Sequence, residues 1–282
     1  MISSPRLSRR SFLTAVTATP LALAAQQRKR FPVGLELYSV DKDLRQDFNG
    51  TLRAVAAMGY ECVEFIPIDF DMTAARAREV RKLLDDLGMK CFSTRNWEKA
   101  FTPEGLAHAI EINQILGSRL LVLTTAAQIA NLDGWKSVAE MLNRAAEKLR
   151  PVGMRPGFHN HPSEFQPLGN GRPIELLAAQ TTKDVAFEFD AGNCVSAGYD
   201  PVAWIEKNPG RFPVLHVKDW SSDRSRGFRV LLGEGVVPWQ KIMAAAEKTG
   251  GVEYYLIEQE GSDYPPMETA KRSLALYRKL HA

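Results

Sequence analysis

The sequence predicts a (β/α)8 barrel, in which eight parallel strands alternate with helices. Three observations support this prediction: short apolar runs alternate with segments of helical period from Phe31 onward, the alternation occurs eight times, and the repeats span the length typical of such barrels, about 250 residues. The main alternative is an open doubly wound sheet. It is disfavoured because no glycine-rich dinucleotide loop follows the first strand, where Tyr38-Ser39-Val40-Asp41 stands instead.

Eight apolar runs are the predicted strands. In chain order they are Val33–Tyr38, Tyr60–Phe65, Lys90–Thr94, Leu120–Thr124, Met154–His159, Val185–Asp190, Val214–Val217 and Tyr254–Glu258. Predicted helices between and after them include Thr73–Leu87, Pro103–Leu116, Gly134–Leu149, Trp239–Lys248 and Met267–Leu280. Glycines such as Gly88 and Gly117 stand where helices end, as helix C-caps commonly do. Pro156 is unfavourable inside a barrel strand because it lacks an N–H, so a start of the fifth strand after Pro156 is left open.

The composition is that of a globular protein. The chain has 282 residues, of which 45% are hydrophobic and 24% charged, and this excludes disorder. The net charge of +3 comes from Arg6, Arg9 and Arg10, because the remaining chain has as many acidic as basic residues. A neutral chain lacks the basic field that nucleic-acid binding requires. Three widely spaced cysteines without a CxxC pair indicate neither a disulfide framework nor a zinc ribbon.

The first 30 residues have the pattern of an export signal. Arg9-Arg10 directly precede an apolar run from Phe12 to Ala25, which is too short for a membrane span of about 20 residues. This resembles a bacterial twin-arginine signal peptide, and cleavage is expected near Ala24 or Ala25. An uncleaved anchor or a chance arginine pair is the alternative. We therefore expect residues 1–30 to be a signal peptide and short linker, residues 31–282 to be one catalytic barrel, and the location to be the periplasm or cell envelope, with no membrane contact after cleavage.

Titratable residues gather at the ends of the last four predicted strands, where barrel enzymes carry their active sites. His159, Asp190, His216 and Glu258 would form a ring of two imidazoles and two carboxylates on adjacent strands. Such mixed ligands suit one divalent ion such as Mn, Co, Zn or Fe. Taken singly, each residue also has an ordinary structural explanation, as a helix cap, a core histidine or a salt-bridge partner. Four on consecutive strand ends favour a metal site.

Seven segments together resemble the xylose isomerase-like TIM barrel superfamily, which includes the sugar phosphate isomerase/epimerase family, and in particular its His-Asn-His subgroup. They are Val33–Val40, Gly59–Phe65, His159-Asn160-His161 with Glu164-Phe165, Asp190–Asn193, His216–Asp219, Leu232–Gly235 and Glu258-Gln259-Glu260. The resemblance implies a barrel with one divalent metal, for which Asp190, His216 and Glu258 occupy three ligand positions. Ketose epimerases of the superfamily carry Glu at the fourth position. Here it is His159, and either His159 or Glu164 would complete the site.

The same superfamily resembles endonuclease IV, a three-zinc DNA repair enzyme. This chain has only five histidines, of which His108 and His281 lie in predicted helical segments, and Asn193 replaces a further imidazole. One metal and a neutral surface therefore argue against DNA repair. Phosphorylated sugars are also disfavoured, because an exported enzyme rarely meets them and no glycine-rich phosphate loop follows the last strands.

The expected reaction removes a carbon-bound proton next to a carbonyl of a sugar or cyclic polyol, through an enediolate that the metal stabilises. Candidate bases are His161, Glu258 and Glu260, with Lys218 placed to neutralise or protonate an oxygen. Returning the proton gives isomerisation or epimerisation, which is the first prediction. Expelling a β-substituent would give a lyase, as in inosose dehydratases and enzymes that open 3-keto-glycosides by β-elimination. A non-catalytic, exported carbohydrate-binding barrel is a further alternative.

Several residues near the predicted strand ends are candidate substrate contacts. They are Tyr38, Glu64, Arg95, Asn96 and Glu164, with Trp97 beside them. Packing at the rim of the barrel is the alternative for each. The segment from Asp219 to Val237 is long for a barrel loop, so it is expected to be either a lid or a variable excursion. The sequence leaves open whether the protein forms a homo-oligomer.

Overall fold

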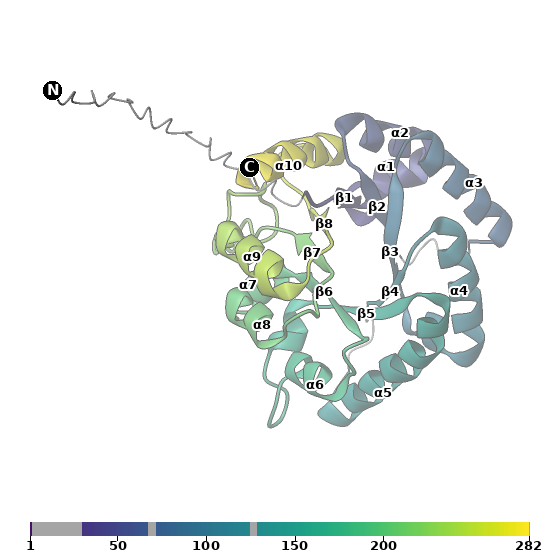
Figure 1. Ribbon diagram of the computed structural model, residues 1–282, viewed down its shortest axis with the longest axis vertical. Coiled ribbons are helices and arrows are strands. Elements are labelled where there is room, and N and C mark those ends of the chain that lie inside the picture. The colour runs from purple at the N-terminus through teal and green to yellow at the C-terminus, as the bar shows by residue number, and fades with distance from the viewer. Residues whose placement is uncertain (2–29, 67–71, 125–128, 282) are drawn as a thin grey trace. The chain divides into compact units, whose positions relative to one another are not determined.

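The computed structural model describes residues 1, 30–66, 72–124 and 129–281. The predicted signal peptide and its cleavage site lie outside these described residues. From Phe31 onward, eight parallel strands close into a barrel in the order β1 to β8, and helices surround it (Figure 1). The predicted fold class is confirmed. Within the described ranges, no helix is both long and apolar enough to cross a membrane.

The elements follow the predicted alternation. The strands are β1 Val33–Glu36, β2 Cys62–Phe65, β3 Lys90–Asn96, β4 Leu120–Leu123, β5 Arg155–His159, β6 Ala186–Asp190, β7 Val214–Val217 and β8 Tyr254–Ile257. The α-helices are α1 Asp41–Gln46, α2 Phe48–Met58, α3 Ala74–Asp86, α4 Pro103–Leu116, α5 Leu132–Leu149, α6 Pro173–Gln180, α7 Ala191–Ser196, α8 Pro201–Lys207, α9 Trp239–Ala245 and α10 Pro266–Leu280. Short 3-10 turns include η1 Leu37–Val40, η3 Glu98–Phe101, η4 Arg150–Val152 and η5 Pro162–Phe165, and a π-helical turn, η6 Ala246–Gly250, continues α9.

Strand β5 contains Pro156, so the start after this proline that the sequence left open does not occur. Pro156 pairs with Leu121 of β4, whereas the pairing of β5 with β6 begins only at Gly157 opposite Ala186. On the β4 side, the residues before and after Pro156 make the ladder hydrogen bonds around this pair. The backbone nitrogen of position 156 points to the other side, toward β6. Because β6 has not yet begun there, Pro156 forfeits no ladder bond.

The barrel interior has an apolar layer near the amino ends of the strands. Its members are Cys62, Leu120, Val122, Ala186, Val214, Tyr254 and Leu256. Gly34 of β1 belongs to this level, because a Cβ there would lie 2.5 Å from the Cys62 sulfur and 2.8 Å from the Leu256 side chain. Side chains alternate between the two faces of a strand. The next inward-facing residue of each strand therefore lies two positions on, above this floor and nearer the carboxyl end of the barrel.

The next level of the interior is charged. Register aligns Glu36 with Glu64, His159 with Glu188, and Asp190 with His216 across neighbouring strands. All six side chains are fully buried. The strand register therefore stacks ionisable groups directly above the apolar floor.

The long segment after β7 is anchored by one buried carboxylate. Asp219 accepts hydrogen bonds from the backbone N–H groups of Trp220 at 2.8 Å, Gly233 at 2.7 Å, Gly235 at 3.3 Å and Val237 at 3.3 Å. The Trp239 indole also donates to it, at 3.2 Å. These hydrogen bonds connect both ends of the loop to the end of β7, so Asp219 stabilises the loop conformation.

We predict that Asp219→Asn lowers the free energy of unfolding by about 2–4 kcal/mol, because an amide nitrogen would face several N–H donors and charge-assisted bonds would be lost. Urea denaturation measures this difference. Asp223→Asn, in the same loop but exposed and bonded to Ser225 at 2.9 Å, is the matched control, with an expected change below about 0.5 kcal/mol. Equal losses in the two variants would show that Asp219 does not hold the loop.

Candidate metal centre and active-site mouth

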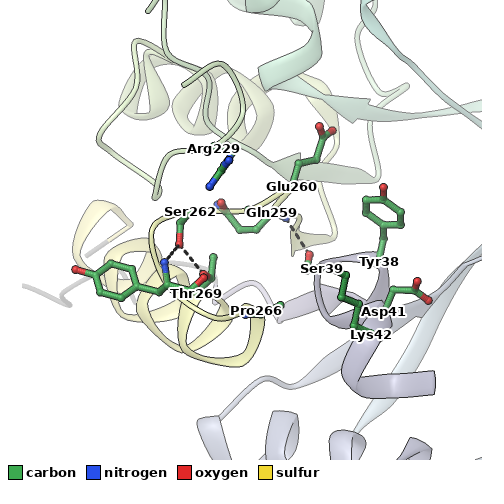
Figure 2. Close-up of a pocket in the computed structure, with 12 residues that line it drawn as sticks. Tyr38, Ser39, Asp41, Lys42, Arg229, Gln259, Glu260, Ser262, Pro266 and Thr269 are labelled. Carbon is green, nitrogen blue, oxygen red and sulfur yellow. Dashed lines mark hydrogen bonds between the residues drawn. The ribbon is translucent and has the colours of Figure 1, made fainter. Parts of the chain in front are cut away.

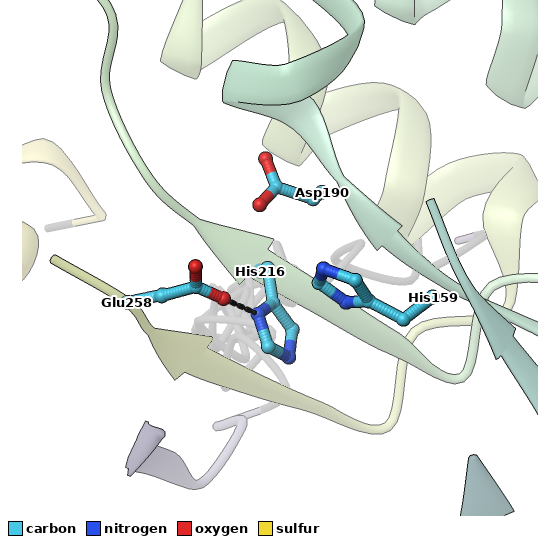
Figure 3. A group of neighbouring side chains, drawn as sticks. All are labelled: His159, Asp190, His216 and Glu258. Atoms are coloured by element: carbon cyan, nitrogen blue, oxygen red, sulfur yellow. Dashed lines mark hydrogen bonds and ion pairs between the residues drawn. The ribbon is translucent and has the colours of Figure 1, made fainter. Parts of the chain in front are cut away.

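Four side chains converge at the carboxyl ends of β5 to β8. His159, Asp190, His216 and Glu258 each offer a ligand atom, these atoms lie within 4.8 Å of one another, and all four residues are buried (Figure 3). This ring is the set of residues that the sequence placed on four consecutive strand ends. Two imidazoles and two carboxylates are a donor set that suits Mn, Co, Zn or Fe. The cluster can therefore bind a divalent metal.

His159 is oriented by a carboxylate that the sequence analysis did not single out. Its Nδ1 lies 3.0 Å from Oε2 of Glu188, and its Nε2 has no hydrogen-bond partner among the described residues. Burial, followed by the charge of Arg95, holds the pKa of His159 well below its usual range, so the ring is neutral. Because Glu188 fixes the proton on Nδ1, Nε2 presents a lone pair. This is the carboxylate–histidine arrangement found behind metal ligands.

His216 is surrounded by carboxylates. Its Nδ1 lies 2.9 Å from Oε2 of Glu258, and its Nε2 lies 3.2 Å from Glu64 and 3.3 Å from Glu188. Burial alone would lower its pKa, but Glu188, Glu258 and Glu64 outweigh burial and raise the pKa of His216 well above its usual range. A protonated ring donates through Nδ1 to the Glu258 carboxylate. A cation shared by Nδ1 and that carboxylate would take the place of the Nδ1 proton.

Asp190 has two separate roles, one for each oxygen. Oδ1 accepts from the Asn193 backbone N–H at 2.8 Å and caps α7, whereas Oδ2 faces the ring, 2.9 Å from Nζ of Lys218. Asn160 fixes the position of the Asp190 backbone at the end of β6. Its amide both donates to the Asp190 carbonyl and accepts from the Asp190 N–H, each at 3.0 Å. The asparagine between the two histidines thus ties the end of β5 to the end of β6.

Lys218 is a buried cation held among acids. Its ammonium lies 2.9 Å from Asp190, donates to Glu258 at 2.9 Å and donates to Glu260 at 2.8 Å. Burial would lower its pKa, but Asp190 and Glu258 reverse this and raise the pKa of Lys218. A protonated amine therefore lies beside one member of the ring and reaches the half-exposed Glu260 at the mouth.

Arg95 spans the opposite side of the ring. It donates to Glu36 and to Glu258, each at 3.3 Å, and to the Thr124 hydroxyl at 3.1 Å. Its side chain is 10% exposed. Arg95 therefore connects the end of β3 to acids on β1 and beyond β8, and it lies at the floor of the mouth.

The buried charges near the ring are out of balance. Glu36, Glu64, Glu188, Asp190 and Glu258 are at most 3% exposed, and the cations beside them are Arg95, Lys218 and His216, whose raised pKa keeps it protonated. Burial, followed by Glu188, raises the pKa of Glu64 to about 8, and burial raises the pKa of Asp190 to about 6. An uncompensated carboxylate is expensive to bury. The residues present thus fit a divalent cation in donor type, orientation and charge.

A hollow of about 350 Å³, here called the mouth, borders the ring through Glu258, the ring member in its lining. Its lining comprises Glu36, Tyr38, Asp41, Arg45, Ile66, Arg95, Trp97, Thr124, His161, Lys218, Glu258 and Glu260. The His161 side chain is 35% exposed, and its ring centroid lies 5.1 Å from that of His159. All four sequence-predicted catalytic candidates, His161, Lys218, Glu258 and Glu260, therefore meet in this mouth.

The predicted substrate contacts divide into two groups. Tyr38 and Arg95 line the mouth. Glu64 is fully buried below the ring, where Ser93 donates to it, and Asn96 is buried with its amide donating to Thr94. The structure thus places these two side chains away from the mouth.

Glu164 is not part of the ring. Its carboxylate accepts from the His161 backbone N–H and from the Ser163 hydroxyl at 2.8 Å, which closes a capping box around η5. Burial outweighs these bonds and raises its pKa to about 7. The geometry therefore leaves the fourth position of the ring to His159.

Sequence reasoning missed Glu36, Glu188, Asn160 and Thr124. A signal existed for Glu188, which stands two residues before Asp190 on the same strand and so shares its inward face. In the same way, Glu36 stands two residues after Gly34 on the first strand and so shares its inward face. Asn160 carried no such signal, because its partners are backbone groups of another strand.

Known proteins share this architecture. The family model described as "Xylose isomerase-like TIM barrel" matches residues 52–280. An inosose dehydratase from Lacticaseibacillus casei is 25% identical over 148 residues, which are 45% of this chain and 48% of that protein. The chain thus spans about half the length of this curated relative.

Solved structures agree in fold. A sugar phosphate isomerase/epimerase from Parabacteroides distasonis has a TM-score of 0.75 and 27% identity, covering 91% of this chain and 97% of that chain. An "IOLI protein" solved with a zinc atom has a TM-score of 0.67 and 13% identity, covering 88% of this chain and 97% of that chain. At 13% identity, the second likeness shows the fold alone.

We predict that Glu188→Gln weakens divalent-metal affinity by about 10- to 100-fold, because an amide orients and polarises the His159 ring less well than a carboxylate. Competition with a metal-sensitive dye measures this affinity. Glu164→Gln is the matched control and should retain wild-type affinity. Unchanged affinity in Glu188→Gln would remove Glu188 from the support of the site.

The raised pKa of Glu164 predicts a pH effect on stability. The folded carboxyl keeps its proton up to about pH 7, whereas the unfolded one releases it near the ordinary pKa of a glutamate, 4.5. Between these values the folded state binds more protons, so this residue lowers wild-type stability as pH rises. Relative to wild type, Glu164→Gln should gain up to about 3 kcal/mol from pH 4.5 to 7. Denaturation at several pH values tests this, with exposed Glu140→Gln as control, and a pH-independent difference would contradict it.

Proposed function

Because the chain belongs to the xylose isomerase-like TIM barrel family, we propose that it is a divalent-metal-dependent isomerase or epimerase of an unphosphorylated sugar or keto-sugar. The observation that carries the proposal is the buried ring of His159, Asp190, His216 and Glu258, which borders, through Glu258, a mouth lined by further acid and base groups. The full-length likeness to a sugar phosphate isomerase/epimerase supports this reaction class.

The ring would hold the metal through Nε2 of His159, Nδ1 of His216 and oxygens of Asp190 and Glu258. A divalent ion bound there supplies Lewis acidity toward substrate oxygens, which acidifies the C–H next to a carbonyl. The protein must then supply bases and acids. Arg95 keeps Glu258 in place from one side, and Lys218 does so from the other.

Two bases on separate strands fit proton transfer at both faces of a carbon. Glu258 follows β8, and His161 follows β5, with β6 and β7 between them on one side of the barrel. One group removes the proton from carbon, and the other returns a proton to the opposite face or to the neighbouring carbon. Lys218, bonded to Glu258 and Glu260, is the donor for an oxygen that develops negative charge.

A lyase is the second candidate, and one feature favours it. Position 159 is a histidine that Glu188 holds as a neutral ligand, so the ring has a carboxylate base only on the Glu258 side. After proton removal there, the Lys218–Glu260 pair could protonate a departing hydroxyl or alkoxide. The partial similarity to an inosose dehydratase favours the same chemistry.

A non-catalytic carbohydrate-binding barrel is the third candidate. A binder has no need for a protonated lysine shared by two glutamates beside a metal ring. The twin-arginine-like start of the chain supports export to the periplasm or cell envelope, where free polyols and glycosides are the available carbohydrates. We therefore propose that the protein acts in the periplasm or cell envelope and that its substrates are free polyols or glycosides.

The reaction is tested by incubating the metal-loaded protein with keto-sugars and inososes in deuterated water and following products by NMR. We predict deuterium at the carbon next to the carbonyl, together with an isomer or epimer. His161→Gln should lower conversion by at least about 100-fold while exchange at one face persists, because one of two bases is lost. His108→Gln, on α4 and outside the lining of the mouth, is the control.

Two results would decide against the first candidate, and a third would remove His161 from its mechanism. An unsaturated product that has lost water or an alcohol would establish the lyase. Unchanged conversion in His161→Gln would exclude His161 as a base. Binding of sugars without exchange or product in the metal-loaded protein would leave the binding barrel.

A further inference from the structure

A second hollow of about 390 Å³ lies beside the mouth. Its lining comprises Tyr38, Ser39, Asp41, Lys42, Arg229, Gln259, Glu260, Gly261, Ser262, Tyr264, Pro266 and Thr269 (Figure 2). Three of these residues, Tyr38, Asp41 and Glu260, also line the mouth above the ring. The two hollows are therefore neighbours that share a wall. Each has a volume at the lower end of the range for small-molecule sites, about 300–1,000 Å³.

Gln259 gives this side hollow an unmet hydrogen-bonding demand. The residue is 3% exposed, and neither its amide nitrogen nor its amide oxygen has a partner among the described residues. Its backbone is fixed, because its N–H donates to the Ser39 hydroxyl at 2.9 Å, as Figure 2 shows. A buried amide without partners costs free energy that a ligand could recover. That ligand must both donate and accept hydrogen bonds, as hydroxyl groups do.

The lining of the side hollow carries charged groups of both signs. Its acids, Asp41 and Glu260, are paired with cations outside this lining, Arg45 at 2.9 Å and Lys218 at 2.8 Å. Its own cations are Lys42 and Arg229. Polar groups of both signs can bond to the hydroxyl groups of a polyhydroxylated molecule, and glucose 6-phosphate tests whether the two cations select an anion instead.

Exposed aromatic rings flank the two hollows. Among the described residues, Tyr38 at 55%, Trp97 at 40% and Tyr264 at 42% are the aromatic side chains in the set of exposed large hydrophobics. Trp97 lines the mouth, Tyr264 lines the side hollow, and Tyr38 lines both. Flat rings with a polar tip offer an apolar face to the C–H surfaces of sugar rings. Their gathering at one end of the barrel marks an extended carbohydrate surface.

We propose that the substrate is a glycoside of at least two sugar units, with one ring over the metal centre and a second sugar unit in the side hollow. The link between the units would pass Tyr38, where the hollows share a wall. Gln259 would bond to hydroxyl groups of the second unit. This inference rests on the proposed function, because it names the substrate class of the same site.

The test compares binding of glucose, cellobiose, maltose, trehalose, sucrose and glucose 6-phosphate to the metal-loaded full chain by calorimetry. At least one disaccharide should bind 10-fold or more tightly than glucose. Gln259→Leu, which keeps the side-chain size and removes both polar atoms, should weaken that disaccharide about 10-fold and glucose less than twofold. Gln166→Leu makes the same chemical change outside both hollows and should alter neither.

Disaccharides that bind no more tightly than glucose would overturn the two-unit site. So would an equal loss of both ligands in Gln259→Leu, or glucose 6-phosphate as the tightest ligand. If monosaccharides still exchange deuterium, only this inference falls and the proposed function stands. A Gln259-dependent preference for a disaccharide without exchange on any substrate would support the two-unit site and remove the catalytic proposal.

Discussion

The upper half of the barrel depends on compensation of a buried excess of negative charge. Strand register stacks four carboxylates above an apolar floor, Glu258 follows β8 beside them, and the cations among them are Arg95, Lys218 and the protonated His216. Each strand end is placed by bonds among these groups, from Glu188 behind His159 to Lys218 between Asp190 and Glu258. A divalent ion in the ring would settle the charge and engage the free Nε2 of His159. Fold and site are thus two consequences of the same packing.

The sequence predicted the fold and the ring well because both follow from simple periods. Alternation of strand and helix identified the barrel, and the two-residue period placed His159 and Glu258 at the right ends. The same period also places Glu188 and Glu36 on the inward face of their strands. It does not tell how far along the barrel axis a residue lies, so the acids below the ring were not identified. The roles of Asn160 and Pro156 could not be predicted from this period. Their behaviour depends on where a neighbouring strand starts or ends, which only the closed barrel defines.

The mouth is asymmetric, and this asymmetry links the site to its chemistry. On one side Glu258, Lys218 and Glu260 form a connected acid–base chain. On the other, His161 is a lone, partly exposed imidazole beside the ligand His159. In the proposed reaction, these few residues would decide between returning a proton to carbon and expelling a leaving group. In the proposed two-unit site, the side hollow would add a selection on size, because Gln259 and the exposed aromatic rings extend the binding surface beyond the space for one sugar ring.

Metal content tests the central claim most directly. The protein is purified without chelator, and its Mn, Co, Zn and Fe are quantified beside those of an Asp190→Ala, His216→Ala double variant whose fold is checked by circular dichroism. About one equivalent in the wild type and none in the folded variant is the predicted result. A wild-type protein without metal that also takes up none from a stoichiometric supply, or one that holds two or three equivalents, would contradict a mononuclear centre.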